Sequence, residues 1–214
     1  MTESMTEIRQ LFQNEDTPTV AQALVGMYLE HTLPDGSKLG GWIVDCEAYL
    51  GPEDEAAHSF GLRKTPRVAA MYQEAGSIYL YHMHRQVILN MVTREAGLPQ
   101  GVMIRALEPE RQYMEKMSEN RGGKSGVDLT NGPGKLMSAL NVPFDLYGQS
   151  IFTSALHLVP EKKRQPKQIL VLPRIGIPNK GKWTALPLRF VCKGNPYVTK
   201  QLKKEISPDW GWQE

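Results

Sequence analysis

The chain has 214 residues, of which 41 % are hydrophobic and 22 % are charged, and its formal net charge is +2. This composition is ordinary for a soluble globular domain, and we expect one domain over residues 1–214. The sequence has no apolar run long enough to cross a bilayer, and its first residues lack the basic and apolar regions of a secretory leader.

The cysteines of the chain indicate the compartment in which the protein works. The two cysteines, Cys46 and Cys192, each lie in an apolar stretch. This placement indicates buried free thiols in a reducing compartment rather than a disulfide framework or a zinc site, so we expect a cytoplasmic protein.

Twelve of the 25 Lys and Arg residues lie between Lys162 and Lys204, a segment without Asp or Glu. A solvated basic face and a polyanion-binding surface both fit this segment, and its interleaved aromatic residues favour the second.

The first half of the chain alternates capped helices with strands. Thr17-Pro18 is an N-cap followed by proline at the first helical position, which predicts a helix to about Leu29. Residues 41–46 predict a strand that places Glu47 and Tyr49 on one face near its end, before Gly51-Pro52 stops it. Thr65-Pro66 opens a short helix to Tyr72. Its free amides, next to Arg63 and Lys64, make a candidate phosphate site.

The second half is predicted to contain mostly strands. Residues 77–83 and 86–92 predict a hairpin with a tight turn near His84-Arg85. A glycine-rich run, 130–135, leads into a short helix over 136–140. Further strands are expected at 102–107, 151–152, 156–158, 169–172 and 188–192, with helical residues from about 109 to 117. This order favours a single mixed α+β domain with a curved antiparallel β-sheet flanked by helices.

One run carries more chemistry than the rest of the chain. Residues 47–59, EAYLGPEDEAAHS, gather carboxylates, an aromatic ring and a histidine around a Gly-Pro turn. The run resembles the signature of the alkyladenine (3-methyladenine) DNA glycosylase family, here in a bacterial form. The resemblance covers about residues 39–198, and its further segments occur in the family's order: RKTPR at 63–67, YLY at 79–81, IRALEP at 104–109, NGPGKL at 131–136, PRIG at 173–176 and PLRF at 187–190.

The resemblance implies a monofunctional enzyme that flips a damaged purine out of duplex DNA and hydrolyses its N-glycosidic bond, which starts base excision repair. The implied fold has a protruding hairpin that inserts into DNA, no metal or other cofactor, and a monomer associated with the nucleoid. The implied catalytic residues are Glu47, as general base, and Arg105, which helps to hold the attacking water. The implied pocket residues are Tyr49, Ala57, His58, His84, Asn90 and Ile175. The implied DNA contacts are Tyr81, as the wedge, with Arg63, Thr65, Arg67, Met71 and Lys135.

The sequence departs from the family pattern at the hairpin. A second pocket tyrosine usually follows the wedge by three positions, where this chain has His84, and the hairpin before Asn90 is one residue shorter. A protonated histidine there would repel a cationic base, so the preferred lesion is open among 3-methyladenine, 7-methylguanine, hypoxanthine and ethenoadenine.

Two other classes of function are compatible with parts of the sequence. His82 and His84 alternate on one strand face and, with Glu47, suggest a metal-dependent hydrolase, although no further ligand stands at a recognisable spacing. A non-catalytic lesion-binding protein would share the basic surface and the pocket. Such a protein would not need the carboxylate of Glu47.

Overall fold

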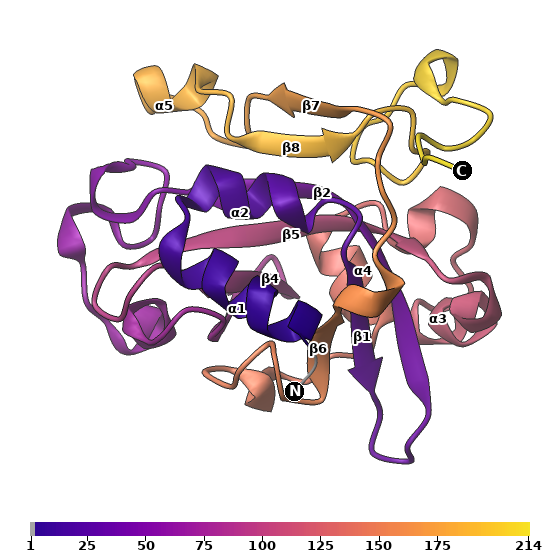
Figure 1. Ribbon diagram of the computed structural model, residues 1–214, viewed down its shortest axis with the longest axis horizontal. Helices are drawn as coiled ribbons and strands as arrows, with labels where there is room; N and C mark the ends of the chain where they lie inside the picture. The colour runs from indigo at the N-terminus through magenta and orange to yellow at the C-terminus, as the bar shows by residue number, and fades with distance from the viewer. Residues whose placement is uncertain (1–2) are drawn as a thin grey trace.

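The computed structural model describes residues 3–214, and an antiparallel sheet of eight strands forms its centre. Six strands follow the order β3-β4-β5-β2-β1-β6, β8 joins through β2, and β7 pairs with β8 (Figure 1). The strands are β1 (Tyr28–Thr32), β2 (Lys38–Tyr49), β3 (Ile78–Met83), β4 (Gln86–Thr93), β5 (Gln100–Pro109), β6 (Leu156–Val159), β7 (Ile169–Leu172) and β8 (Arg189–Cys192). The mixed α+β fold with a curved antiparallel sheet is therefore confirmed.

Short helices surround this sheet. The α-helices are α1 (Glu3–Asn14), α2 (Thr17–Leu24), α3 (Met114–Asn120), α4 (Pro133–Ala139) and α5 (Lys182–Ala185). The 3-10 helices are η1 (Gly51–Glu53), η2 (Phe60–Leu62), η3 (Pro66–Tyr72), η4 (Arg111–Tyr113), η5 (Gly126–Leu129), η6 (Phe144–Leu146), η7 (Pro160–Lys162) and η8 (Lys203–Glu205). Helix α2 packs on β2 and β5, and α4 packs on β4 and β5. Among residues 3–214, no helix has the length and apolar character needed to cross a membrane.

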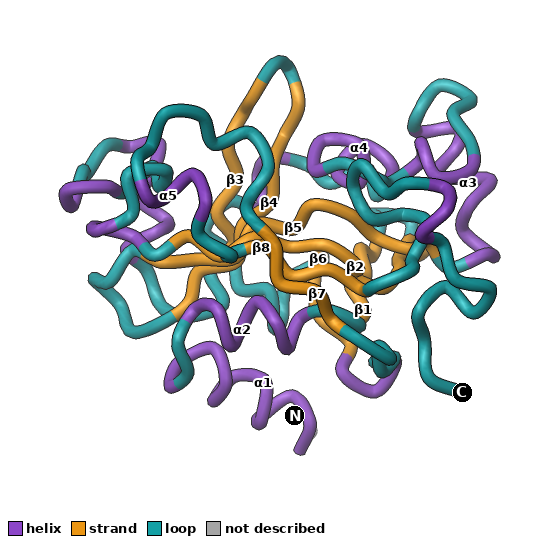
Figure 2. Tube along the Cα trace, turned by 90° about the horizontal axis from the view of Figure 1, so that it is seen from above, coloured by secondary structure: helices purple, strands orange, loops and turns teal. Residues whose placement is uncertain are grey.

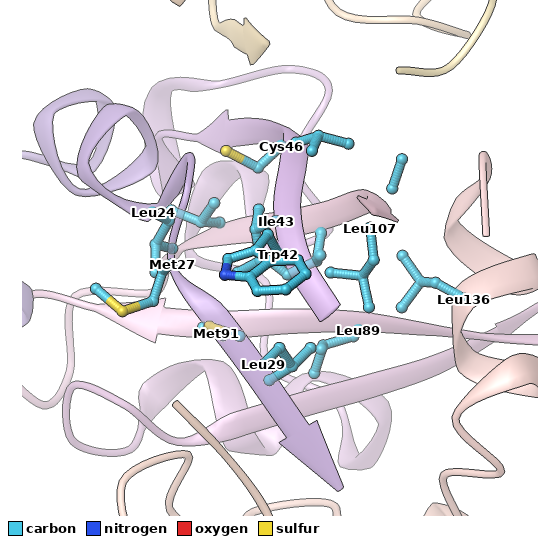
Figure 3. Packing of buried hydrophobic residues seen from close by; sticks show 14 of the residues in the cluster. Leu24, Met27, Leu29, Trp42, Ile43, Cys46, Leu89, Met91, Leu107 and Leu136 are labelled. Atoms are coloured by element: carbon cyan, nitrogen blue, oxygen red, sulfur yellow. The ribbon is translucent and has the colours of Figure 1, made fainter. Parts of the chain in front are cut away.

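The main core lies between the sheet and these helices. Trp42, Ile43 and Leu107 meet Leu24 from α2 and Leu136 from α4 (Figure 3). The side chains of β2 alternate between its two faces, and one of these faces packs on α2. The thiol of Cys46 points to α2, where it donates to the Ala21 carbonyl at 3.0 Å, so its neighbours along the strand face the other way. Both cysteines are free and buried, as the sequence predicted.

The register of the sheet brings residues from three strands into one row. Glu47 on β2 lies opposite Met103 on β5, and Met103 lies opposite Asn90 on β4. Directly opposed residues of an antiparallel pair project to the same face, so these three side chains share one surface. On its other edge, β2 places Glu47 opposite Arg189 of β8. The strand therefore has a neighbour on both sides at this position, which fixes its backbone.

The β3–β4 hairpin stands out from the body of the molecule (Figure 2). Its last pair is Met83 opposite Gln86, so His84 and Arg85 alone form the turn. Both turn residues have positive φ angles, 47° and 67°, as a two-residue type I′ turn requires. The hairpin and its turn were predicted correctly.

The structure corrects two expectations from the sequence and adds one helix. The first predicted helix ends at Leu24 rather than Leu29, because Gly26 takes a φ of +91° and the apolar residues after it enter β1 between β2 and β6. Residues 151–152 form a turn instead of a strand. Helix α1 was not predicted, and it buries only Phe12 fully, so its apolar signal is weak.

The C-terminal end of the chain is docked rather than mobile. Trp212 is buried, and its indole N–H donates to the Glu108 carboxylate at 2.7 Å. Asn195 donates to the same oxygen, and Arg164 pairs with the other oxygen at 2.7 Å. Glu108 therefore joins the end of β5 to two segments of the C-terminal region.

We predict that Trp212→Ala lowers the free energy of unfolding by roughly 3 to 5 kcal/mol, because a large buried ring is lost and Glu108 loses a donor. Urea denaturation measures this change. The matched control is Trp210→Ala, whose ring is 42 % exposed, and which should cost less than about 1 kcal/mol. Equal effects of the two substitutions would show that the end of the chain is not docked.

Candidate active site

The centre of the site is the carboxylate of Glu47, which is fully buried. Its Oε1 accepts from the backbone N–H of Ile175 at 2.8 Å and lies 3.1 Å from Nη1 of Arg105. Its Oε2 accepts from the hydroxyl of Tyr49 at 2.9 Å. The predicted placement of Glu47 and Tyr49 on one face of the strand is thereby confirmed. Three donors from three segments orient one carboxylate.

Burial raises the pKa of Glu47 above its ordinary value, because removal from water penalises the charged form. The Arg105 guanidinium and the Ile175 N–H oppose this shift and favour the carboxylate. A carboxyl group with a raised pKa binds a proton more readily near neutral pH than an exposed glutamate does. Glu47 is therefore suited to proton transfer.

A pocket of about 460 Å³ lies next to this carboxylate, because the three residues that donate to Glu47, namely Tyr49, Arg105 and Ile175, are part of its lining. Its lining residues come from several parts of the chain: Tyr49 at the end of β2, with Ala56, Ala57 and His58 after it; Met71 of η3; Tyr79, Tyr81, Met83, His84 and Asn90 of the hairpin; Met103 and Arg105 of β5; Pro133 of α4; and Ile175, Gly176 and Ile177 after β7. All six predicted pocket residues, Tyr49, Ala57, His58, His84, Asn90 and Ile175, are among them. The structure thus brings these residues together, and their roles stay predictions.

Aromatic rings form one wall of the pocket. The ring of Tyr81 meets His58 edge-on, with centroids 4.6 Å apart, and lies 5.6 Å from the ring of Tyr79. The hydroxyl of Tyr79 is 2.8 Å from Nδ1 of His58. Burial raises the pKa of Tyr81 to about 12 and that of Tyr49 well above its ordinary value, so both phenols are neutral near pH 7.

The imidazole of His58, like the tyrosine rings of this wall, is uncharged near neutral pH. The His58 residue is exposed in part, but the groups packed around its ring displace water and lower its pKa, and the nearby charges of Arg67 and Arg63 lower it further. The imidazole is therefore neutral at physiological pH. Because Glu47 and Arg105 compensate each other, the pocket presents aromatic and polar groups without an excess of positive charge.

Tyr81, which the resemblance implies as the wedge, does not lie at the hairpin tip. Tyr81 lies on β3 opposite Ile88, and its ring is part of the pocket wall. The tip consists of Met83, His84 and Arg85, which are all exposed. Asn90 is buried below the hairpin, and its amide donates to the Tyr79 carbonyl at 3.5 Å.

The predicted DNA-contacting residues separate into three places. Arg63, Thr65 and Arg67 line a recess beside the pocket together with His58 and Lys180. Met71 is buried in the wall of the pocket itself. Lys135 donates to Asp128 and, at 2.8 Å, to Asn131, so its ammonium group already has partners. The helix that begins after Thr65 is a 3-10 helix.

The basic segment from Lys162 to Lys204 is not one continuous basic face. Arg174 and Arg189 are buried, each beside an aspartate, and Lys167 pairs with Asp209. Lys180, by contrast, is exposed at the recess described above.

The residues suggested for a metal site lie apart. His82 faces away from the pocket, where its ring stacks on Phe144 with centroids 4.7 Å apart. Glu47 is held by Arg105, Tyr49 and the Ile175 amide. Over residues 3–214, no group of three or more His, Cys, Asp and Glu side chains could hold a metal ion.

A model of the methylpurine-DNA glycosylase family matches residues 11–196. The chain belongs to this family. Among its relatives, a protein of Enterococcus faecalis is 61 % identical over the whole chain and 93 % of its own length. Relatives from Listeria monocytogenes and Staphylococcus carnosus are 48 % and 47 % identical, cover 92 % and 91 % of the chain, and each match over 94 % of their own length. All three carry the name "Putative 3-methyladenine DNA glycosylase".

Membership makes this glycosylase a DNA repair enzyme that hydrolyses N-glycosyl bonds and takes DNA as its substrate. The match also begins earlier than the resemblance in the sequence, at residue 11 rather than about 39. The additional part includes α2 and β1, which flank β2.

Several residues of the glycosylase site were missed by sequence reasoning. Tyr79 alternates with Tyr81 on β3, so the period of the strand could have placed it on the same face. Met103 lies opposite Glu47, which only the strand register reveals. Asp54 and Arg174 meet behind Tyr49, and no pattern in the sequence joins them.

We predict that the imidazole of His58 titrates below the ordinary histidine value of about 6.5. A pH titration of the histidine resonances by NMR measures this, and loss of one resonance in His58→Gln assigns it. Arg67→Gln should raise this pKa, because one of the charges that oppose protonation is removed. Arg9→Gln, which changes a remote arginine over Phe152, should leave it unchanged. Titration of His58 at or above the ordinary value would contradict the neutral wall.

Proposed function

We propose that this glycosylase turns a damaged purine nucleotide out of duplex DNA into the pocket and hydrolyses its N-glycosidic bond with Glu47 as general base. The geometry around Glu47 is the observation that supports this most strongly. A fully buried carboxylate is oriented by three donors, and the residues that supply these donors line a pocket with aromatic walls. A chain that only bound lesions would gain nothing from the cost of burying this charge.

The proposed reaction breaks the bond between the sugar C1′ and the purine nitrogen, and the electron pair leaves with the base. A water oxygen bonds to C1′, and its proton passes to Glu47. Oε2 of Glu47 accepts a hydrogen bond from Tyr49, and a carboxylate oxygen has a second lone pair for a water. The negative charge also favours the cationic character of the sugar in the transition state.

Arg105 is proposed to help hold this water or the sugar. Arg105 is buried but belongs to the lining of the pocket. Its Nε has no hydrogen-bond partner among the described residues. Ile175 contributes through its N–H, which donates to Glu47. These groups orient the base and its nucleophile by contacts that exist before substrate binds.

The neutral aromatic wall supports a substrate class of alkylated and deaminated purines: 3-methyladenine, 7-methylguanine, hypoxanthine and ethenoadenine. A cationic purine over a tyrosine face gains roughly 0.5 to 2 kcal/mol, depending on desolvation. A cationic base leaves as a neutral molecule and needs no added proton, whereas a neutral base such as hypoxanthine leaves as an anion and takes its proton from water. Asn90 is proposed to discriminate against the amino group of guanine.

We propose that the enzyme is monofunctional and leaves an abasic site with an intact strand. Strand cleavage by a glycosylase requires an amine nucleophile that attacks C1′. No lysine is among the residues that line the pocket in the described part of the chain.

The tip of the hairpin is proposed to fill the gap that the flipped nucleotide leaves in the duplex. The tip protrudes (Figure 2), and Met83 is an exposed apolar side chain there, 43 % exposed, next to His84 and Arg85. Apolar wedges from a protruding element compensate for lost base stacking. Tyr81, the wedge expected from the sequence, is better placed to stack on the flipped base.

We predict that Glu47→Gln lowers the single-turnover rate of base release by at least about 10²- to 10⁴-fold, because the shape is kept and the general base is lost. Release of hypoxanthine or ethenoadenine from a duplex, followed by alkaline cleavage, measures this rate. Affinity for the lesion duplex should stay near that of the parent. The control is Glu53→Gln, an exposed carboxylate in the same motif, which should keep the rate. Near-parental activity of Glu47→Gln would overturn the proposed function.

We predict that the double variant Met83→Ala, His84→Ala reduces the flipped fraction of bound lesion DNA, because the gap in the duplex is no longer filled. Fluorescence of ethenoadenine, which rises when the base leaves the stack, reports this fraction. Leu202→Ala removes an exposed apolar side chain elsewhere and should have no effect. If the double variant has a normal flipped fraction and Tyr81→Ala has a reduced one, Tyr81 is the wedge and the proposal for the tip is wrong.

A further inference from the structure

Two charged side chains lie buried behind the pocket and take no part in the proposed chemistry. The guanidinium of Arg174 and the carboxylate of Asp54 have no exposed surface. They form two hydrogen bonds, of 2.5 Å from Nη1 to Oδ2 and 2.9 Å from Nη2 to Oδ1. Such a pair is expensive to bury, and apolar residues of the same volume often give equal stability. Its presence beside the pocket therefore calls for a reason other than stability.

The pair joins the two loops that build the site. Asp54 accepts from the N–H of Leu50 at 3.1 Å and from the N–H of Ala56 at 3.0 Å, which shapes the turn that leads to His58. Arg174 belongs to the loop after β7 and donates to the Ala48 carbonyl at 3.1 Å, at the end of β2. One ion pair thus sets the distance between the turn after β2 and the loop after β7.

Arg174 also lies next to two of the three groups that orient Glu47, the Tyr49 ring and the Ile175 N–H. Its guanidinium carbon lies 4.6 Å from the centroid of the Tyr49 ring, and the hydroxyl of Tyr49 donates to Oε2. The next residue, Ile175, donates its N–H to Oε1 at 2.8 Å. A displacement of Arg174 would therefore move both donors. Asp54 compensates the positive charge, so the pocket stays favourable to a cationic base.

We propose that Arg174 and Asp54 are a positioning pair for the glycosylase reaction: they hold the Tyr49 ring and the Ile175 N–H where both orient Glu47. The inference rests on the proposed role of Glu47. Neither residue touches the pocket, so the pair acts through its neighbours. Displacement of a reacting group by about 1 Å costs on the order of 10²-fold in rate, so small shifts of these donors should be measurable.

The test compares the same conservative substitution at two arginines, each of which pairs with a buried carboxylate and lies over an aromatic ring; the Arg174 side chain has no exposed surface, whereas that of Arg164 is 39 % exposed. Arg174→Lys keeps the charge but loses the paired hydrogen bonds and the flat contact with the ring. Arg164→Lys is the matched control, because Arg164 also pairs with a buried carboxylate, Glu108, and lies over an aromatic ring, Trp42, at 3.4 Å. Arg164 lies outside the pocket lining. Single-turnover rates on an ethenoadenine duplex at saturating enzyme, duplex affinity and thermal stability are measured for both.

We expect Arg174→Lys to lower the single-turnover rate by about 10²-fold with little change in duplex affinity, and Arg164→Lys to keep the parental rate in its folded fraction. The pH profile gives a second readout. The Ile175 N–H favours the charged form of Glu47, so its loss raises the pKa of Glu47 further. The acidic fall in rate should then move to higher pH in Arg174→Lys and stay in place in Arg164→Lys.

A second variant covers the case in which Arg174→Lys does not fold. Asp54→Asn keeps the shape and removes the charge that holds Arg174, and it should lower the rate and shift the acidic fall in the same direction. The proposal is wrong if the folded variants keep the parental rate and pH profile, or if Arg164→Lys loses as much rate as Arg174→Lys. In either case the pair is only a structural contact. The Glu47→Gln measurement separates the two levels of inference: if that variant stays active, the proposed function fails; if only the Arg174 and Asp54 variants behave like the parent, this inference fails alone.

Discussion

The burial of one carboxylate sets the constraint on which the rest of the site depends. Glu47 is fully buried in β2, between Met103 of β5 and Arg189 of β8. A charge without water requires donors at fixed positions, and here they come from Arg105, Tyr49 and a backbone amide after β7. Strands and loops far apart in the sequence must therefore be in place before this group can exist as a carboxylate. The sheet serves as the rigid support for it.

The cost of burying a charge also accounts for a neutral pocket next to a cationic recess. His58 stands between them: Arg63 and Arg67 on the recess side, together with the groups packed around its ring, keep its pKa low. Arg63, Arg67 and Lys180 thus line the recess together with Glu55, and the pocket keeps aromatic faces. This separation fits the proposed function, in which the recess attracts a polyanion and the pocket does not repel a cationic base.

The basic C-terminal segment shows how tertiary contacts redistribute charge. As a string of residues it suggests one DNA-binding surface, yet Arg174 and Arg189 are buried with aspartates, and Arg164 lies over Trp42 beside Glu108. These arginines connect β7, β8 and the docked chain end to the sheet. Lys180 remains exposed near the pocket. Much of the segment's charge therefore stabilises the fold and the site from inside.

The sequence by itself determined the elements with strong local signals and the identity of the site's central residues. The alternation in β2 placed Glu47 and Tyr49 on one face, and the turn residues at 84–85 marked the hairpin, because strand periodicity and turn geometry act over a few residues. Only the tertiary structure decided that the apolar run after Gly26 forms a strand, since its neighbours β2 and β6 supply the hydrogen bonds. It also placed Tyr81 in the wall and joined Asp54 to Arg174, which are 120 positions apart. Contacts of that range depend on strand register and loop packing, for which a local pattern carries no signal.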